Sequence, residues 1–473
     1  MANRLDKLII GGLLATVIFT PLAHGAVEPW SIAVFELLIV LLMLLWAVKC
    51  VMDKRIVITV PITAYPIGAF LLYGLIQSIT RTDSEGNLTS LSIDPEATRV
   101  AVTVLFFLLA AHVIAANFFN STARLNVLVH FLMIFGFALA LLGMIQLVTG
   151  NGDRLFFRPV QSGSGFLTGP FVNHNHFAGY IELLIPLPIA FIITGVQRQY
   201  RILYGFSAVM MAVALILTAS RAGMISLAAG ILFALLLGVN YNSRMRRSSN
   251  AYEPNAPAAS KRTVRRLLSG LAVLGLAAAA VFVGTVWLGL GPVLDRVVDN
   301  SLISNDAKAE TFESSRGWIW KTTGNMIWAN PVFGIGLGSY ETAYPLYSDK
   351  DQTQIVDRAH NDYLQLLSDT GLIGGVIGLG FLLMFVYNVM RLARCKDRIS
   401  AAIAIGGAAA IVSVLVHSLF DFNLQIPSTA LLFLVLNAVL SYIVFSTVES
   451  KQEARQPFIS QNSGTVSALG VSS

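Results

Sequence analysis

Residues 427–446 read PSTALLFLVLNAVLSYIVFS, a run of twenty positions without a charged side chain. A helix of this length extends about 30 Å, the thickness of the hydrocarbon core of a bilayer. Because lipid offers no partner for backbone N–H and C=O groups, such a segment crosses a membrane as an α-helix. The stretch therefore predicts a helical membrane protein rather than a soluble domain.

Segments of the same kind recur along the whole chain of 473 residues. The composition is 55% hydrophobic and 12% charged, against about 25% charged residues in soluble domains. The net charge of +6 reports topology in such a protein and does not indicate nucleic-acid binding. We predict an all-α polytopic membrane protein with about twelve transmembrane helices. The helices are expected at 8–25, 31–49, 56–79, 99–117, 124–149, 176–196, 202–219, 222–240, 266–290, 371–391, 400–419 and 427–446.

The positions of the basic residues predict the orientation. Cytoplasmic loops of membrane proteins carry an excess of Lys and Arg. With the N-terminus inside, most of the basic residues fall on the cytoplasmic side, including seven between 242 and 266 and four between 391 and 398. We therefore expect both termini in the cytoplasm, with a retained first helix rather than a cleaved signal peptide.

A polar stretch at 291–370 interrupts the hydrophobic pattern between the ninth and tenth expected helices. The orientation puts this stretch on the outer face of the membrane, and it contains two segments with helical patterns. The segment 317–329 predicts a helix whose apolar side rests on the bilayer interface, and a second helix is expected to begin near Asn361. The expected parts are 1–290 with membrane helices one to nine, 291–370 as a large helical loop domain, 371–447 with helices ten to twelve, and a disordered cytoplasmic tail at 448–473.

Two residues at the expected helix starts of this loop are candidates for chemistry. Arg316 falls in the first helical turn, where the helix dipole disfavours a cation by up to about 1 kcal/mol. An anion bound by both the guanidinium and the free N–H groups would explain this position, and a surface ion pair with Glu313 is the alternative. His360 precedes Asn361, and nearby helix N–H groups favour the neutral imidazole that a general base requires. The alternative is a histidine that only satisfies backbone groups of the turn.

Further polar residues are expected on the same outward face. Arg221, between two membrane helices, is either an anion clamp or an interfacial arginine that reaches lipid phosphates. Asn173, His174, Asn175 and His176 precede the sixth helix, and we interpret them as donors and acceptors for sugar hydroxyls or phosphate. A metal site is the less favoured reading, because no carboxylate or cysteine completes it. We assign the remaining polar groups in or near the spans, His112, His130, His417 and Asp421, to helix packing or to the lining of the cavity.

These residues together predict an outward cavity that contains several arginines and one histidine. Guanidinium groups match phosphate oxygens in a two-point contact. The chain shows no nucleotide-binding motif, and nucleotides are scarce outside the cytoplasm. An activated donor that is tethered to a lipid satisfies both observations.

Five short motifs make the sequence similar to a known family. They are TGPFVNHNHFAGY at 168–180, TASRAG at 218–223, SRGW at 315–318, NPVFGIG at 330–336 and AHNDYLQ at 359–365. In content, order and the large outward loop, the chain resembles the O-antigen ligase/polymerase superfamily of bacterial membrane glycosyltransferases, over about residues 160–375.

The resemblance implies a metal-independent glycosyltransferase of the GT-C type without a cofactor. The implied donor is a glycan on undecaprenyl pyrophosphate, and the implied acceptor is lipid A–core or a growing glycan. Arg221 and Arg316 would hold the pyrophosphate and stabilise its developing charge, and His360 would orient or deprotonate the acceptor hydroxyl. Other substrate contacts are expected from Asn173, His174, Asn175, His176, Arg158, Arg358, Asn361, Asp362 and Tyr363.

The resemblance leaves the exact role open. An O-antigen ligase of lipopolysaccharide biosynthesis, an exopolysaccharide polymerase and a transferase to protein all fit, with the first two preferred. Each would work at the periplasmic face of the bacterial inner membrane. The alternative from another class is a transporter or flippase of a lipid-linked or anionic substrate, which usually shows inverted repeats and helices broken at the midplane.

Overall fold

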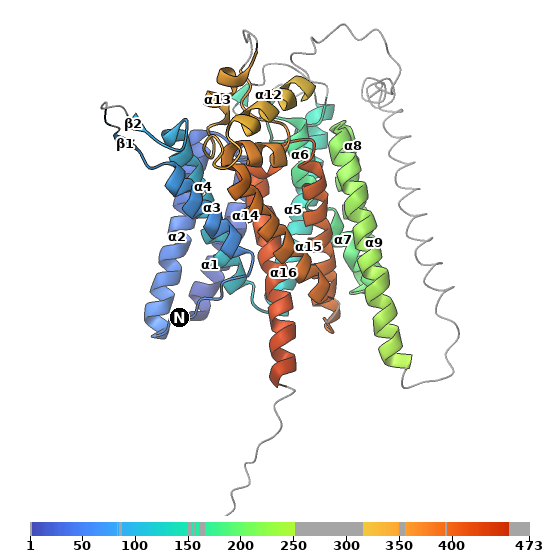
Figure 1. Ribbon diagram of the computed structural model, residues 1–473. Coiled ribbons are helices and arrows are strands. Elements are labelled where there is room, and N and C mark those ends of the chain that lie inside the picture. Colours follow the sequence, from blue (N-terminus) through green and yellow to red (C-terminus); the bar gives the residue numbers. More distant parts are fainter. Residues whose placement is uncertain are drawn as a thin grey trace, which may run out of the picture.

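A computed structural model describes residues 2–82, 84, 88–149, 154–155, 158–159, 166–250, 316–349, 355–392 and 395–453. The expected ninth membrane helix at 266–290, the first part of the loop domain at 291–315 and most of the tail lie outside these residues. Within them, long helices stand side by side in a bundle, and shorter helices cover one of its ends (Figure 1).

Ten helical segments of the described residues are long and apolar enough to cross a membrane. This confirms the prediction of an all-α polytopic membrane protein. The helices of these segments are α1 (Ala2–Leu22), α2 (Pro29–Asp53), α4 (Pro95–Phe118), α5 (Thr122–Val148), α6 (His174–Ile181) together with α7 (Pro186–Thr194), α8 (Arg201–Leu217), α9 (Arg221–Asn250), α14 (Asp362–Leu392), α15 (Arg398–His417) and α16 (Pro427–Glu453).

The remaining elements are short. The predicted span at 56–79 contains α3 (Ala64–Gln77), an apolar helix of 14 residues that is shorter than a typical span. Two small antiparallel ribbons join β1 (Arg81–Thr82) to β2 (Leu88–Thr89) and β3 (Arg154–Leu155) to β4 (Arg158–Pro159). The others are η2 (Arg198–Tyr200), α12 (Arg316–Ala329), α13 (Tyr340–Tyr347) and η3 (Asn423–Gln425).

The centre of the bundle is formed by α6 with α7, α15 and α16. Within their apolar windows, 89% of the residues of α6 with α7, 78% of α15 and 89% of α16 are buried, against 17% in α14. Small residues fill much of α15 and allow neighbouring backbones to approach closely. Gly230 of α9, for example, lies against Ser413 and the carbonyl of Ala409 so tightly that a β-carbon would collide with both.

The short helices α12 and α13 lie over one end of the bundle, at the top of Figure 1. Ile319 and Met326 of α12 are buried in a cluster with residues of α13 and of the segment before α14. The Thr323 and Tyr340 hydroxyls lie 2.6 Å apart in the same contact. The expectation that this apolar face rests on the bilayer is therefore wrong, because protein covers it. A helical period marks an apolar face without specifying its partner.

The loop between α12 and α13 is tied to the middle of α14. Ile335 donates its backbone N–H to Ser368 (2.9 Å), and Gly336 donates to Asp369 (3.0 Å). At this point α14 is interrupted by Gly371, whose φ of 58° and ψ of −156° are not helical. A β-carbon on Gly371 would also collide with the carbonyl of Val332. The kink separates 362–370 from the rest of α14, as the sequence predicted for the start of the tenth span.

Candidate functional site

The site is centred on Asp421, in the loop that joins α15 to α16. The Asp421 side chain is 0% exposed. One of its oxygens lies 3.1 Å from Nδ1 of His360, and the other lies 3.7 Å from the Arg316 guanidinium. Two residues that sequence analysis singled out are thus joined by a third that it had assigned to lining or packing.

The charges around Asp421 determine the protonation state of its carboxyl group and the tautomer of His360. Burial alone would raise the pKa of Asp421, but the hydrogen bond from His360 and the positive potential of His176, His360 and Arg316 outweigh it, and the pKa falls well below its ordinary value. An ionised carboxylate can only accept hydrogen bonds. Nδ1 of His360 must therefore carry the proton, and a neutral ring then presents its Nε2 lone pair away from Asp421.

His360 adopts a strained backbone conformation. Its φ of 49° lies in the left-handed region, which a residue with a β-carbon enters at a cost of about 1–3 kcal/mol. The side chain is 29% exposed, so the ring remains accessible while Nδ1 reaches the buried carboxylate. Such a conformation persists only where surrounding contacts hold it, and here the bond to Asp421 is one of them.

Three residues after His360 hold the loop that carries Asp421. The Asn361 amide donates to the carbonyl of Leu419 (2.9 Å), while its oxygen caps the first turn of α14. Asp362 accepts from the Ser418 hydroxyl (2.8 Å), and the Tyr363 hydroxyl donates to the carbonyl of Leu415 (2.6 Å). These side chains, which were expected to contact substrate, are engaged in positioning the segment 415–425.

Of the motif at 173–176, mainly the last residue, His176, lies next to the Asp421 site. His176 is buried and its ring lies 4.7 Å from that of Phe422, while the His360 ring lies 5.0 Å from the same phenyl group. Phe422 is therefore in contact with both imidazoles. Asn173 caps α6 by accepting from Asn175 (2.8 Å), and the His174 ring packs against Phe166.

Arg221 lies at the same end of the bundle as His176. It is exposed and is the first residue of α9. The Ser220 hydroxyl accepts from the N–H of Gly223, and Gly223 packs so closely on Ala178 of α6 that a β-carbon would lie 2.9 Å from that side chain. The start of α9 is thus fixed against α6, two residues beyond His176.

The other two predicted arginines, Arg358 and Arg158, show no contact with the Asp421 site among the described residues. Arg358 is partly buried and donates to the carbonyl of its neighbour Asp357 (2.6 Å). Arg158 belongs to β4, where its backbone pairs with Leu155, and its side chain lies outside the described structure.

A second buried pair lies beside this site. From the sequence we assigned one member, His417, to helix packing or cavity lining, and the other, Glu182, was missed. Nδ1 of His417 is 3.1 Å from both oxygens of Glu182, and both side chains are 0% exposed. Glu182 stands at the break between α6 and α7, within the predicted span 176–196. An acidic residue inside an apolar run is a recognised signal of function or of a buried partner, and this signal could have identified Glu182.

The described residues contain no group of three or more His, Cys, Asp or Glu side chains that could hold a metal ion. The functional groups that they bring together are guanidinium, imidazole and carboxylate. This combination can bind an anion and move a proton in the same place.

Comparison with known proteins gives independent information on the function. No curated protein sequence matches the chain. A family model described as O-antigen ligase matches residues 206–379, a range that contains Arg221, Arg316 and His360. Over these residues the chain is similar to the O-antigen ligase family, and the match together with the apolar helices supports a multi-pass membrane protein with a glycan-processing function of the ligase/polymerase type.

Proposed function

We propose that the protein transfers a glycan from a lipid-linked pyrophosphate to an acceptor hydroxyl. The observation that carries this proposal is the convergence of Arg316 and His360 on the buried carboxylate of Asp421. An anion-binding group and a base in one place match what such a transfer requires. The family match supports the general reaction class.

The proposed step is a displacement at the anomeric carbon. The acceptor hydroxyl forms the new C–O bond while the bond to the pyrophosphate oxygen breaks. The hydroxyl proton passes to Nε2 of His360, and Asp421 stabilises the resulting imidazolium through Nδ1–H. The negative charge that develops on the departing pyrophosphate is stabilised by Arg316 and Arg221.

Arginine suits this task better than lysine would. A guanidinium group has five N–H donors in a planar fork, so Arg316 can contact Asp421 through one nitrogen and an anion through others. Its side chain is 44% exposed, which leaves it accessible to a ligand. We propose that these groups replace a metal ion in neutralising the pyrophosphate, and that no cofactor is needed.

The proposed donor is a glycan on undecaprenyl pyrophosphate, and the acceptor is lipid A–core or a growing glycan. The reaction would occur at the periplasmic face of the bacterial inner membrane. This assignment rests on the resemblance of the motifs and on the excess of basic residues at the other end of the bundle.

The test compares variants in cells that lack the native gene. His360→Ala, Arg316→Ala and Arg221→Ala should each reduce glycan transfer at least about a hundredfold while the protein remains in the membrane. Arg316→Lys should also be impaired, because an ammonium group makes no two-point contact. Lys321→Ala is the matched control, since Lys321 is an exposed cation on the same helix.

Surface glycans on gels provide the readout and also separate the two preferred roles. Loss of a ligase leaves bare lipid A–core with long polymer on its carrier lipid. Loss of a polymerase leaves core with one repeat unit, or no secreted polymer. Normal transfer by the His360→Ala variant would refute the mechanism, and inhibition by a chelator that added divalent ions reverse would refute metal independence.

One observation favours the transporter alternative. The break between α6 and α7 interrupts a membrane span beside a buried ionisable pair, an arrangement that transporters often show. The two functions differ in their products. Purified protein mixed with lipid-linked donor and acceptor should form a new covalent glycan, whereas a transporter would leave both reactants chemically unchanged.

A further inference from the structure

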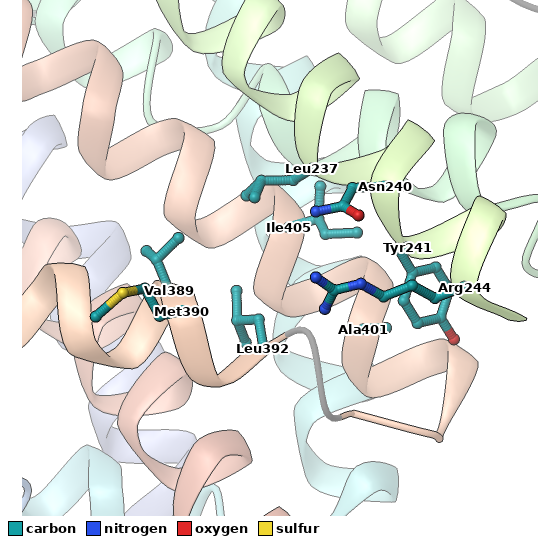
Figure 2. Close-up of a pocket in the computed structure, with 9 residues that line it drawn as sticks. All are labelled: Leu237, Asn240, Tyr241, Arg244, Val389, Met390, Leu392, Ala401 and Ile405. Atoms are coloured by element: carbon teal, nitrogen blue, oxygen red, sulfur yellow. The ribbon is translucent and has the colours of Figure 1, made fainter.

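We infer that a cavity at the opposite end of the bundle from Asp421 binds the phosphate group of an anionic phospholipid. The cavity has a volume of about 430 Å³ and lies between α9, α14 and α15 (Figure 2). Its lining consists of Leu237, Asn240, Tyr241 and Arg244 from α9, Val389, Met390 and Leu392 from α14, and Ala401 and Ile405 from α15.

The position of the cavity separates it from the proposed transfer site. Ala401 stands near the start of α15, and His417 ends the same helix beside the Asp421 loop. Sixteen residues of helix place these two ends about 24 Å apart. Leu392 likewise ends α14, whose first residues hold the Asp421 loop. The cavity therefore belongs to the end of the bundle that the basic residues predict to be cytoplasmic.

Three polar groups of α9 make the cavity suitable for an anion. Figure 2 shows the Arg244 guanidinium and the Asn240 amide extending from α9 toward α14. Tyr241 is only 7% exposed, and its hydroxyl has no hydrogen-bond partner among the described residues. A buried hydroxyl without a partner is costly, and a phosphate oxygen is a strong acceptor for it. Guanidinium, amide and hydroxyl donors are a usual set of phosphate ligands.

The other walls fit a lipid better than free phosphate. Leu237, Val389 and Ile405 are apolar, and a small hydrated anion gains nothing from such walls. Met390 at the edge of the cavity is 65% exposed on α14, the least buried of the membrane-length helices among the described residues. An acyl chain can therefore follow the outer side of α14 while the phosphate lies beside Arg244. Basic pockets between helices on the cytoplasmic side are known sites for anionic lipid headgroups.

Charges around the cavity also favour an anion. Lys396 and Arg398 are exposed near the start of α15, and Arg391 near the end of α14 lies 4.8 Å from the Tyr387 ring. The nearby acidic residue Asp397 is used as the N-cap of α15, where it accepts from the Ser400 N–H (2.9 Å). Its single negative charge is outnumbered by the three cations.

The experiment measures lipid binding to the purified full-length chain by native mass spectrometry and by thermal stabilisation in detergent. Phosphatidylglycerol, phosphatidylcholine and inorganic phosphate are titrated separately. We expect saturable binding of phosphatidylglycerol and at least about tenfold weaker binding of the other two. Equal effects of phosphatidylcholine would show a non-specific lipid surface, and equal effects of inorganic phosphate would show a small-anion site. Either result overturns the inference.

Variants locate the binding. Arg244→Gln removes the charge, Tyr241→Phe removes only the unpartnered hydroxyl, and Ala401→Leu fills the cavity without changing charge. Each should weaken phosphatidylglycerol binding, and Arg244→Gln should weaken it at least about tenfold.

Arg201→Gln is the matched control, because Arg201 is an exposed arginine at the same end of the bundle, on α8. If Ala401→Leu fails to fold, the other two variants decide. Unchanged affinity in Arg244→Gln and Tyr241→Phe would refute the site.

Discussion

At the scale of single residues, Asp421 holds a buried negative charge that is compensated by side chains from distant parts of the chain. His360 contacts it from a position 61 residues earlier in the sequence, and Arg316 contacts it from α12. An unpaired carboxylate in such a place would be very costly. The same contacts that make the burial possible orient the imidazole, so structure and proposed chemistry depend on one group.

The substitution Asp421→Asn tests this dependence, because it keeps the shape and removes the charge. An amide no longer selects the His360 tautomer or stabilises its protonated ring, so transfer should fall by about 10²–10⁴-fold while the protein remains in the membrane. Asp349→Asn, an exposed carboxylate near the same end, is the control. Near-normal transfer by Asp421→Asn would mean that His360 works without this partner.

The low pKa of Asp421 also fixes the direction of a pH effect. Its pKa in the folded protein lies below the ordinary value of about 3.9 that applies to the unfolded chain. The carboxylate therefore stabilises the folded state above about pH 4, and this contribution is lost as the pH falls toward the folded pKa. Any loss of transfer observed between pH 5 and 8 must arise from another group.

The sequence predicted part of this site for clear reasons. Arg316 and His360 stood out because a cation at a helix start and a histidine before a helix cap are locally unusual. Asp421 was visible as a polar residue near a span, but its importance depends on contacts with α12 and α14. Those contacts are made by tertiary packing, which a single sequence does not report.

At the scale of elements, the break between α6 and α7 brings an acidic residue to the centre of the bundle. Residues 182–185 connect the two helices, and Pro186 begins α7. Glu182 at this break meets His417 at the end of α15, directly before the loop that carries Asp421. The pair therefore links the broken span to the proposed site. The sequence did not reveal the break, because the run at 176–196 is apolar on both sides of it.

Removal of one member of this pair should destabilise the protein strongly. In His417→Ala the Glu182 carboxylate stays buried without its partner, which costs about 3–5 kcal/mol. The double variant Glu182→Met with His417→Leu should recover much of this loss, because it leaves no buried charge. Thermal unfolding in detergent measures both, with the exposed Glu341→Gln as control. A double variant as unstable as the single one would show that the pair itself is not the cause.

At the scale of the whole molecule, the two ends of the bundle differ in chemistry. One end carries α12 and α13 (Figure 1) together with the Asp421 loop, and the other carries the cavity at Arg244 with the nearby basic residues Arg391, Lys396 and Arg398. From the sequence we predict which end faces the cytoplasm, because the orientation of membrane helices follows the distribution of Lys and Arg along the chain and does not depend on tertiary contacts. The proposed chemistry requires that the Asp421 end faces outward, where a lipid-linked donor replaces the nucleotide sugars of the cytoplasm.

Labelling of single cysteines tests this orientation. Cys50 and Cys395 are first replaced by alanine, and one cysteine is then placed at exposed Glu341 on α13 or at exposed Arg201 on α8. A maleimide that cannot cross membranes should label position 341 in intact spheroplasts, and position 201 only after lysis, because the excess of basic residues keeps that end inside. The opposite pattern would place His360 and Arg316 in the cytoplasm. The argument for a lipid-linked pyrophosphate donor would then fail, since nucleotide-activated sugars are available on that side.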